Sequence, residues 1–279
     1  MEGFKAVERQ VRFGTARLAA APYRANSLVL TVDGALQSYV DLSDPTRLHL
    51  PYTAWIARVL DLHWPAGEPV SALQVGGGGF TIPRYLAATR PGSPQTVYEL
   101  DGPLVDLVRS HLDLDSVGNL RVHVEDGEEG IRRTPDATAD AVVLDVFRAG
   151  AVAVHLAAVE FLREVARVLR PGGLYLGNTW SAADMTLPLR AVASLAEVFR
   201  HVVLLAEPGL LLGKREGNAV LAASDRELPH RALTAWAEST GNRVACLTAA
   251  QLAAFRGVAA PLTADDPADD VTPVPRWAG

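Results

Sequence analysis

The stretch Val75-Gly76-Gly77-Gly78-Gly79-Phe80 follows a short apolar run and precedes a helical pattern that ends near Ala88. A glycine run between a buried strand and a helix lets a ligand approach the backbone, because no side chain stands in the way. Outward from it, further apolar runs alternate with amphipathic segments, at residues 96–98, 120–124, 141–144 and 174–176. Apolar strands that alternate with helices predict a parallel sheet covered on both faces.

The two ends of the chain depart from this pattern. Before residue 50 the runs are β-type, and residues 29–32 followed by Asp33-Gly34 predict a hairpin with a tight turn. Residues 202–206 and 219–223 are apolar runs without a helix between them, so the last strand pair is expected to be antiparallel. We therefore predict an α/β, Rossmann-like fold with a seven-stranded, mostly parallel sheet and an antiparallel last strand.

Three parts follow from these patterns. Residues 1–50 are expected to form a small N-terminal β-hairpin unit, and residues 51–260 a Rossmann-like catalytic domain. Within that domain, one or two helices are expected beyond Pro229. Residues 261–279 are acidic and contain prolines, so this tail is expected to be poorly ordered.

Composition limits the classes of function. The chain has 279 residues, of which 49% are hydrophobic, as in an ordinary globular protein. Its single cysteine, Cys246, excludes an internal disulfide and a cysteine-rich zinc site, and a cytoplasmic location is expected. A net charge of −6 with scattered arginines argues against nucleic-acid binding, and no apolar stretch predicts a membrane span. No cluster has metal-ligand spacing, so we expect a small-molecule partner and no metal.

The glycine loop and the residue that ends the next strand together indicate a nucleoside site. Loops of this kind lie at the nucleotide sites of doubly wound folds. A nicotinamide site is one alternative, but Thr81 stands where its third glycine would be; a tight connection without a ligand is another. Glu99 ends the second strand, where a carboxylate can accept hydrogen bonds from both ribose hydroxyls.

Further acids follow the third and fourth strands. Asp126-Gly127 follows the third, where a carboxylate can bind an adenine amine or, alternatively, begin a helix as its N-cap. Asp145 follows the fourth, where substrates of open α/β sheets bind, and is the best catalytic candidate; the alternative is a carboxylate that only caps the next loop. His155 either faces the cleft as a second acid or base or has a structural role at the start of a helix.

Taken together, these residues resemble the spermidine synthase family of polyamine aminopropyltransferases, which have a class I methyltransferase fold behind an N-terminal β-unit. The resemblance covers residues 28–224. It rests on a hairpin, a tyrosine, the glycine loop and the acids at the strand ends, namely Asp33-Gly34, Gln37, Tyr52, Gly76–Gly79, Glu99, Asp101, Asp126-Gly127 and Asp145.

The resemblance implies a role for each matched residue. Gln37 and Tyr52 would line the substrate cleft, and Asp145 would remove a proton from the attacking amine. The sulfonium nucleoside, decarboxylated S-adenosylmethionine or S-adenosylmethionine, would be held by the glycine loop and the acids after it, with Glu99 on the ribose and Asp126 on the adenine. The implied nucleoside-binding set is Gly76, Gly77, Gly78, Gly79, Glu99, Asp101, Asp126 and Gly127.

Departures from the family concern the amine-binding half. The family loop reads Gly-Gly-Gly-Asp-Gly, with its aspartate on the amine of the aminopropyl tail, whereas Gly79 and Phe80 hold its last two positions here. The family's Tyr-His-Glu becomes Tyr52-Thr53-Ala54, and Arg148 replaces a second amine-binding aspartate. Arg148 is expected, with His155, beside the substrate.

The resemblance implies transfer of an aminopropyl group from decarboxylated S-adenosylmethionine to an amine acceptor, without a metal. The departures leave two alternatives open, an S-adenosylmethionine-dependent methyltransferase and a non-catalytic nucleoside-binding module. A homodimer or homotetramer follows from the resemblance as well.

Overall fold

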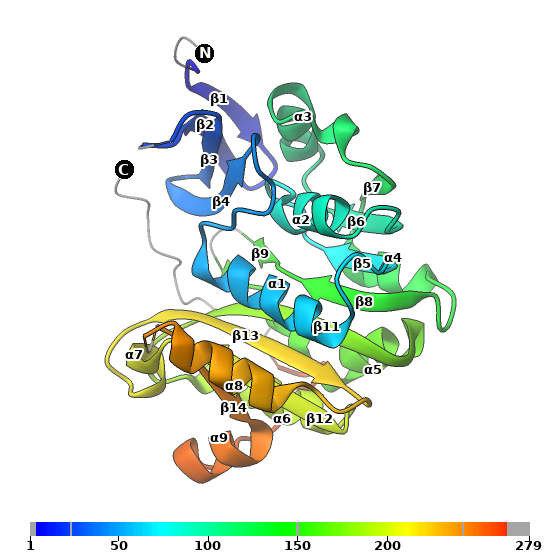
Figure 1. Cartoon of the computed structure of the whole chain (residues 1–279), viewed down its shortest axis with the longest axis vertical. Helices are drawn as coiled ribbons and strands as arrows, with labels where there is room; N and C mark the ends of the chain where they lie inside the picture. Colours follow the sequence, from blue (N-terminus) through cyan, green and yellow to red (C-terminus); the bar gives the residue numbers. More distant parts are fainter. Residues whose placement is uncertain (1–3, 23, 149–150, 242, 267–279) are drawn as a thin grey trace.

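The computed structural model describes residues 4–22, 24–148, 151–241 and 243–266, and Figure 1 shows their arrangement. A small antiparallel sheet lies at one end of the molecule, and a larger mixed sheet flanked by helices forms the rest. Within these residues, no helix has the length and apolar character needed to cross a membrane.

The N-terminal unit is a four-stranded antiparallel meander, larger than the expected hairpin. Its strands, which pair in chain order, are β1 (Val7–Val11), β2 (Gly14–Ala20), β3 (Ser27–Val32) and β4 (Ala35–Asp41). The predicted turn between β3 and β4 is present, with Asp33 and Gly34 at φ of 48° and 82°. Two successive positive φ values suit the right-handed twist of the strands, which is why Asp-Gly favours this turn.

The main sheet has eight strands in the order β14-β12-β13-β11-β8-β5-β6-β7. Its strands are β5 (Ala72–Val75), β6 (Gln95–Glu99), β7 (Leu120–Val124), β8 (Ala139–Leu144), β11 (Leu169–Ser181), β12 (His201–Ala206), β13 (Gly217–Ser224) and β14 (Ala245–Thr248). Strands β5 to β8 and β11 are parallel, and β13 is antiparallel to both its neighbours, as predicted. The prediction of seven strands misses the edge strand β14, which pairs with β12.

The helices and the short elements between strands complete the fold. The helices are α1 (Pro51–His63), α2 (Thr81–Thr89), α3 (Gly102–His111), α4 (Gly127–Arg133), α5 (Val159–Val168), α6 (Thr186–Ala196), α7 (Pro208–Leu211), α8 (His230–Ser239) and α9 (Ala249–Arg256). Between them lie η1 (Leu114–Ser116), η2 (Val154–Ala157), β9 (Phe147–Arg148) and β10 (Ala151–Val152). The helix expected from about Leu156 begins instead at Val159, because η2 precedes it.

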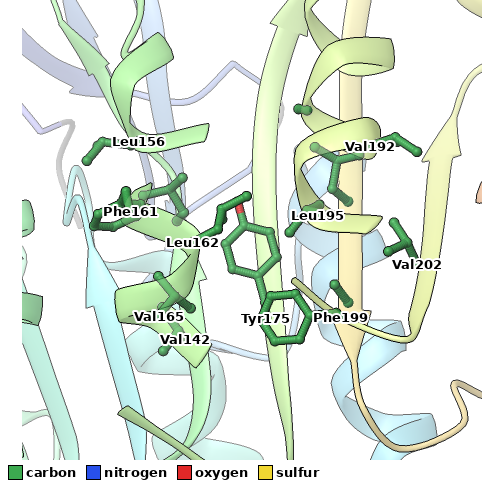
Figure 2. Packing of buried hydrophobic residues seen from close by; sticks show 14 of the residues in the cluster. Val142, Leu156, Phe161, Leu162, Val165, Tyr175, Val192, Leu195, Phe199 and Val202 are labelled. Atoms are coloured by element: carbon green, nitrogen blue, oxygen red, sulfur yellow. The ribbon is translucent and has the colours of Figure 1, made fainter. Parts of the chain in front are cut away.

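The core has an apolar layer on each face of the main sheet. On one face, Tyr175 of β11 is buried between α5 and α6 and stacks on Phe199 with ring centroids 6.4 Å apart (Figure 2). On the other face, the neighbouring Leu174 and Leu176 pack in the layer that α1 and α8 cover. This alternation along one strand is the burial that the apolar run predicts for a sheet covered on both sides.

The N-terminal sheet is fixed to the edge where the parallel strands β5, β6 and β8 end. Asp101 is 2% exposed and makes the link, since Oδ1 accepts from the Leu104 backbone N–H of α3 at 3.0 Å and Oδ2 accepts from the Arg12 backbone N–H at 2.9 Å. Arg12 lies between β1 and β2, so one carboxylate begins a helix of the main domain and holds the small sheet against it.

Replacing Asp101 by alanine should therefore lower the free energy of unfolding by about 2 to 3 kcal/mol, because an N-cap and a buried charge-assisted hydrogen bond are lost together. Urea unfolding measures the change. Asp106→Ala, at an exposed position of the same helix, is the matched control and should stay within about 0.5 kcal/mol of the parent. Equal losses in the two variants would contradict this role.

Candidate functional site

The glycine loop needs its first and third glycines for backbone reasons. Gly76 has a φ of 89°, and a Cβ there would lie 2.1 Å from the Asp145 carbonyl oxygen. Gly78 has a φ of 50°, in the left-handed region that side chains disfavour. The loop thus leaves β5 directly against the end of β8, so the predicted loop and the predicted catalytic residue are neighbours in space.

The other two glycines of the loop make room for Phe80 and for β4. A Cβ on Gly77 would lie 2.7 Å from the Phe80 ring, which is fully buried. The Gly79 N–H donates to Ser38 Oγ at 2.8 Å, and a Cβ on Gly79 would lie 2.7 Å from Ser38 Cβ and 2.9 Å from Val40 Cγ2. Strand β4 therefore occupies the space that a side chain at position 79 would need.

Phe80 adopts a left-handed backbone, with φ of 58° and ψ of 38°, at the position where the family loop has glycine. This conformation costs a residue with a Cβ roughly 1 to 2 kcal/mol. The ring offsets that cost by burial in the core shared by the N-terminal sheet and α3. The departure at Phe80 is thus a packing change that ties the loop to the small sheet.

Glu99, at the end of β6, is bonded to the loop. Its Oε2 accepts from the Gly77 N–H at 2.7 Å and the Gly78 N–H at 3.3 Å, and its Oε1 accepts from the Asp101 N–H at 2.9 Å. A carboxylate offers about four lone-pair sites, so at least one remains for a ribose hydroxyl. The nucleoside-binding roles of Glu99 and Asp101 stay predictions, and the contacts of Asp101 described above are structural.

Asp126 and Gly127 lie where β7 leads into α4. Asp126 is the N-cap of α4, with Oδ1 accepting from the Glu128 N–H at 2.9 Å. Gly127 is needed because a Cβ there would lie 2.2 Å from Val75 Cγ1 of β5. The N-cap alternative is therefore present in the structure, and an adenine contact of the same carboxylate remains a prediction.

Asp145 lies in a half-buried polar group at the carboxyl end of β8. Its Oδ1 accepts from Asn178 Nδ2 at 2.9 Å, and it is also hydrogen-bonded to Tyr52 of α1. Burial raises the pKa of Asp145 from 3.8 to about 6, although the hydrogen bonds from Asn178 and Tyr52 oppose the rise. Burial, and next the Asp145 charge, raise the pKa of Tyr52 well above its ordinary value, so the phenol stays protonated.

The amide side chains of Asn178 and Asn218 also belong to this polar group, and the sequence did not indicate either of them. Asn178 lies on β11 and is 4% exposed, and its Oδ1 accepts from Asn218 Nδ2 of β13 at 3.0 Å. The one available signal is a polar residue at the end of an apolar strand run, and only the strand pairing brings Asn178 beside Asp145.

Three predicted site residues remain, namely Gln37, His155 and Arg148. Gln37 lies on β4 next to Ser38, and its amide donates to the Ala35 carbonyl at 3.4 Å. His155 is a half-buried residue of η2. The Arg148 side chain lies outside the described residues. Substrate contacts of all three stay predictions.

Comparison with known proteins extends this description. A methyltransferase domain family matches residues 73–177, from β5 into β11. A polyamine aminopropyltransferase of Chromobacterium violaceum is 28% identical over 52% of this chain and 55% of its own length. One of Vibrio vulnificus is also 28% identical, over 53% of this chain and 48% of its own. The chain thus spans about half the length of these curated relatives.

A solved structure matches over a longer stretch. The crystal structure of a probable spermidine synthase from Corynebacterium glutamicum superposes with a TM-score of 0.86 at 27% identity. The match covers 94% of this chain and 98% of the other. The small N-terminal sheet and the main sheet therefore occur together in that protein, and the predicted fold class is confirmed.

The raised pKa of Asp145 predicts a pH-dependent gain in stability for Asp145→Asn. Because the folded pKa of about 6 lies above 3.8, the folded state binds this proton more tightly, and the charge opposes folding as pH rises through 6. The variant should have a free energy of unfolding about 1 to 3 kcal/mol higher than the parent at pH 8, with little difference at pH 4. Urea unfolding at both pH values measures this, and a gain of the same size at both would contradict it.

Proposed function

We propose that this chain, a member of the spermidine synthase family with a class I methyltransferase-like fold, transfers an aminopropyl group from decarboxylated S-adenosylmethionine to a small amine. The observation that carries the proposal is the half-buried Asp145–Tyr52 pair beside the glycine loop. A base at this edge of the sheet is next to the place where a nucleoside would lie in an open α/β fold.

The donor would be held by the residues around the loop. The free lone pair of Glu99 suits a ribose hydroxyl, and Asp126, beyond the next strand, suits the adenine amine. The backbone of Gly76 to Gly79 carries no side chain that would keep the sulfonium end away from Asp145. The bound nucleoside itself supplies the activated carbon.

Asp145 would act as the general base. With a pKa of about 6 it is mostly ionised at pH 7, and it is a better proton acceptor than an ordinary aspartate. It takes a proton from the acceptor amine as the nitrogen lone pair forms a bond to the carbon beside the sulfonium. The carbon–sulfur bond breaks, its electron pair stays on sulfur, and a neutral thioether nucleoside leaves. Tyr52 holds the carboxylate through its hydrogen bond.

A second candidate, methyl transfer from S-adenosylmethionine, is favoured by one specific observation. Gly79 packs on Ser38 and Val40 where the family has an aspartate that binds the aminopropyl amine. S-adenosylmethionine has a carboxylate that its decarboxylated form lacks. Because position 79 carries no aspartate here, nothing at this position repels that carboxylate. The two candidates share the nucleoside site and differ in the group that is transferred.

The proposal also covers the setting of the reaction. The acceptor is a small amine, and the protein is a homodimer or homotetramer as the resemblance implies. A cytoplasmic location agrees with the lone cysteine, Cys246, which is buried and reduced. The reaction as proposed uses no metal ion.

Asp145→Asn should leave the affinity for decarboxylated S-adenosylmethionine nearly unchanged while turnover falls about 10² to 10⁴-fold, the usual loss for a general base. Calorimetry measures the affinity, and release of methylthioadenosine in the presence of amines measures turnover. Asp140→Asn, on the same strand but in an ion pair with Arg170, is the matched control and should keep turnover. Full turnover in Asp145→Asn would exclude Asp145 as the base.

The parent protein should bind S-adenosylmethionine at least as tightly as the decarboxylated form, since Gly79 supplies no charge to separate them. Competition calorimetry with both nucleosides measures the ratio of dissociation constants. A preference for the decarboxylated form of more than about tenfold, or 1.4 kcal/mol, would show that another acid selects the donor. Binding of both nucleosides with transfer of methyl alone would favour the second candidate.

A further inference from the structure

A chain of side chains crosses three neighbouring strands behind the proposed base. Gly177 of β11 is in register with Leu144 of β8, so Asn178 and Asp145 are the next residues on adjacent parallel strands. Trp180 is in register with Asn218 of β13, which places Asn218 diagonally from Asn178. The resulting hydrogen bonds run from Asn218 to Asn178 at 3.0 Å and from Asn178 to Asp145 at 2.9 Å.

The direction of these hydrogen bonds is set by charge. An ionised carboxylate only accepts hydrogen bonds, so Asn178 must turn its NH₂ group toward Asp145. Its carbonyl oxygen then points to Asn218, whose NH₂ donates to it. If the Asn178 amide rotated by 180°, its oxygen would face the carboxylate, and its NH₂ would face the NH₂ of Asn218. In the orientation seen here, Asn218 therefore disfavours the rotation of Asn178 that would remove a donor from Asp145.

We propose that Asn178 and Asn218 form an amide relay that positions the Asp145 carboxylate for proton removal, Asn178 by direct contact and Asn218 by fixing the Asn178 amide. That the two asparagines position a catalytic base rests on the proposed function. The hydrogen bonds between Asn218, Asn178 and Asp145 do not depend on it. Both asparagines are positioning residues, since neither is the group that takes the proton.

The relay has a consequence for the titration of Asp145. A hydrogen bond to the charged form stabilises that form, so losing the Asn178 donor should raise the Asp145 pKa further. Four other titratable groups of the described residues lie on or against the loop and β8, namely Tyr52, Arg84, Glu99 and Asp140. Arg84 donates to the Gly79 carbonyl at 3.3 Å, and Asp140, within β8, is paired with Arg170. Tyr52 stays protonated over the relevant range, and Glu99 is held by Gly77 and Gly78. His155, in η2, is the remaining candidate base and is tested separately by His155→Gln.

The experiment measures the titration directly and then the activity. The aspartate carboxyl carbons are labelled with ¹³C, and the Asp145 signal is assigned by its loss in Asp145→Asn. The parent should titrate near pH 6, and Asn178→Ala about one to two pH units higher. Asn218→Ala should move it less, in the same direction. Gln74→Ala is the matched control, because it removes a buried amide hydrogen bond to Gln95 within the sheet and should not move it.

The acid limb of the kcat/KM profile against pH should move to higher pH together with the pKa of the Asp145 carboxyl signal. Asn178→Ala should therefore lose activity at pH 6 and regain part of it at pH 8. An Asp145 signal that titrates at the parent pH in Asn178→Ala overturns the relay. If Asn178→Ala does not fold, an unmoved signal in Asn218→Ala overturns it equally. If the Asp145 signal shifts in Asn178→Ala but the parent protein transfers no group at any pH, the relay stands and the proposed function is removed instead.

Discussion

The close approach of Gly76 to the Asp145 carbonyl sets the geometry on which the site depends. Since even a methyl group at position 76 would lie 2.1 Å from that oxygen, the exit of β5 and the end of β8 are in direct backbone contact. The same loop is bonded to Glu99 on one side and to Ser38 on another. The small sheet, the loop and the proposed base are thus held as one packed unit.

Within that unit, stability and reactivity oppose each other at Asp145. Burial makes the charged carboxylate costly, and the same burial makes it a stronger base. Hydrogen bonds from Tyr52 of α1 and Asn178 of β11 stabilise the charged carboxylate and so offset part of this cost. A rigid sheet at one side and the first turn of α1 at the other hold these donors in place.

The sequence was informative wherever the signal was local. The strand–glycine–helix pattern around residues 72–89, the Asp33-Gly34 turn and the acids at the strand ends are all readable from neighbours in the chain. Strand β14 was missed because it is short, lies between helices, and pairs with a distant strand at the sheet edge. Asn178, Asn218 and Ser38 were missed for a related reason, since only cross-strand register and domain packing bring them to the site.

The packing of Gly79 on Ser38 and Val40 also limits which substitutions this loop can accept. A carboxylate introduced alone at position 79 would meet the Ser38 side chain before it could meet any ligand. Position 38 would have to become smaller, or β4 would have to move outward, before an acid at position 79 could be tolerated. The order in which the two substitutions are made should therefore decide whether the intermediate can pack β4 against the loop, so a change in the loop depends on a strand of the N-terminal sheet.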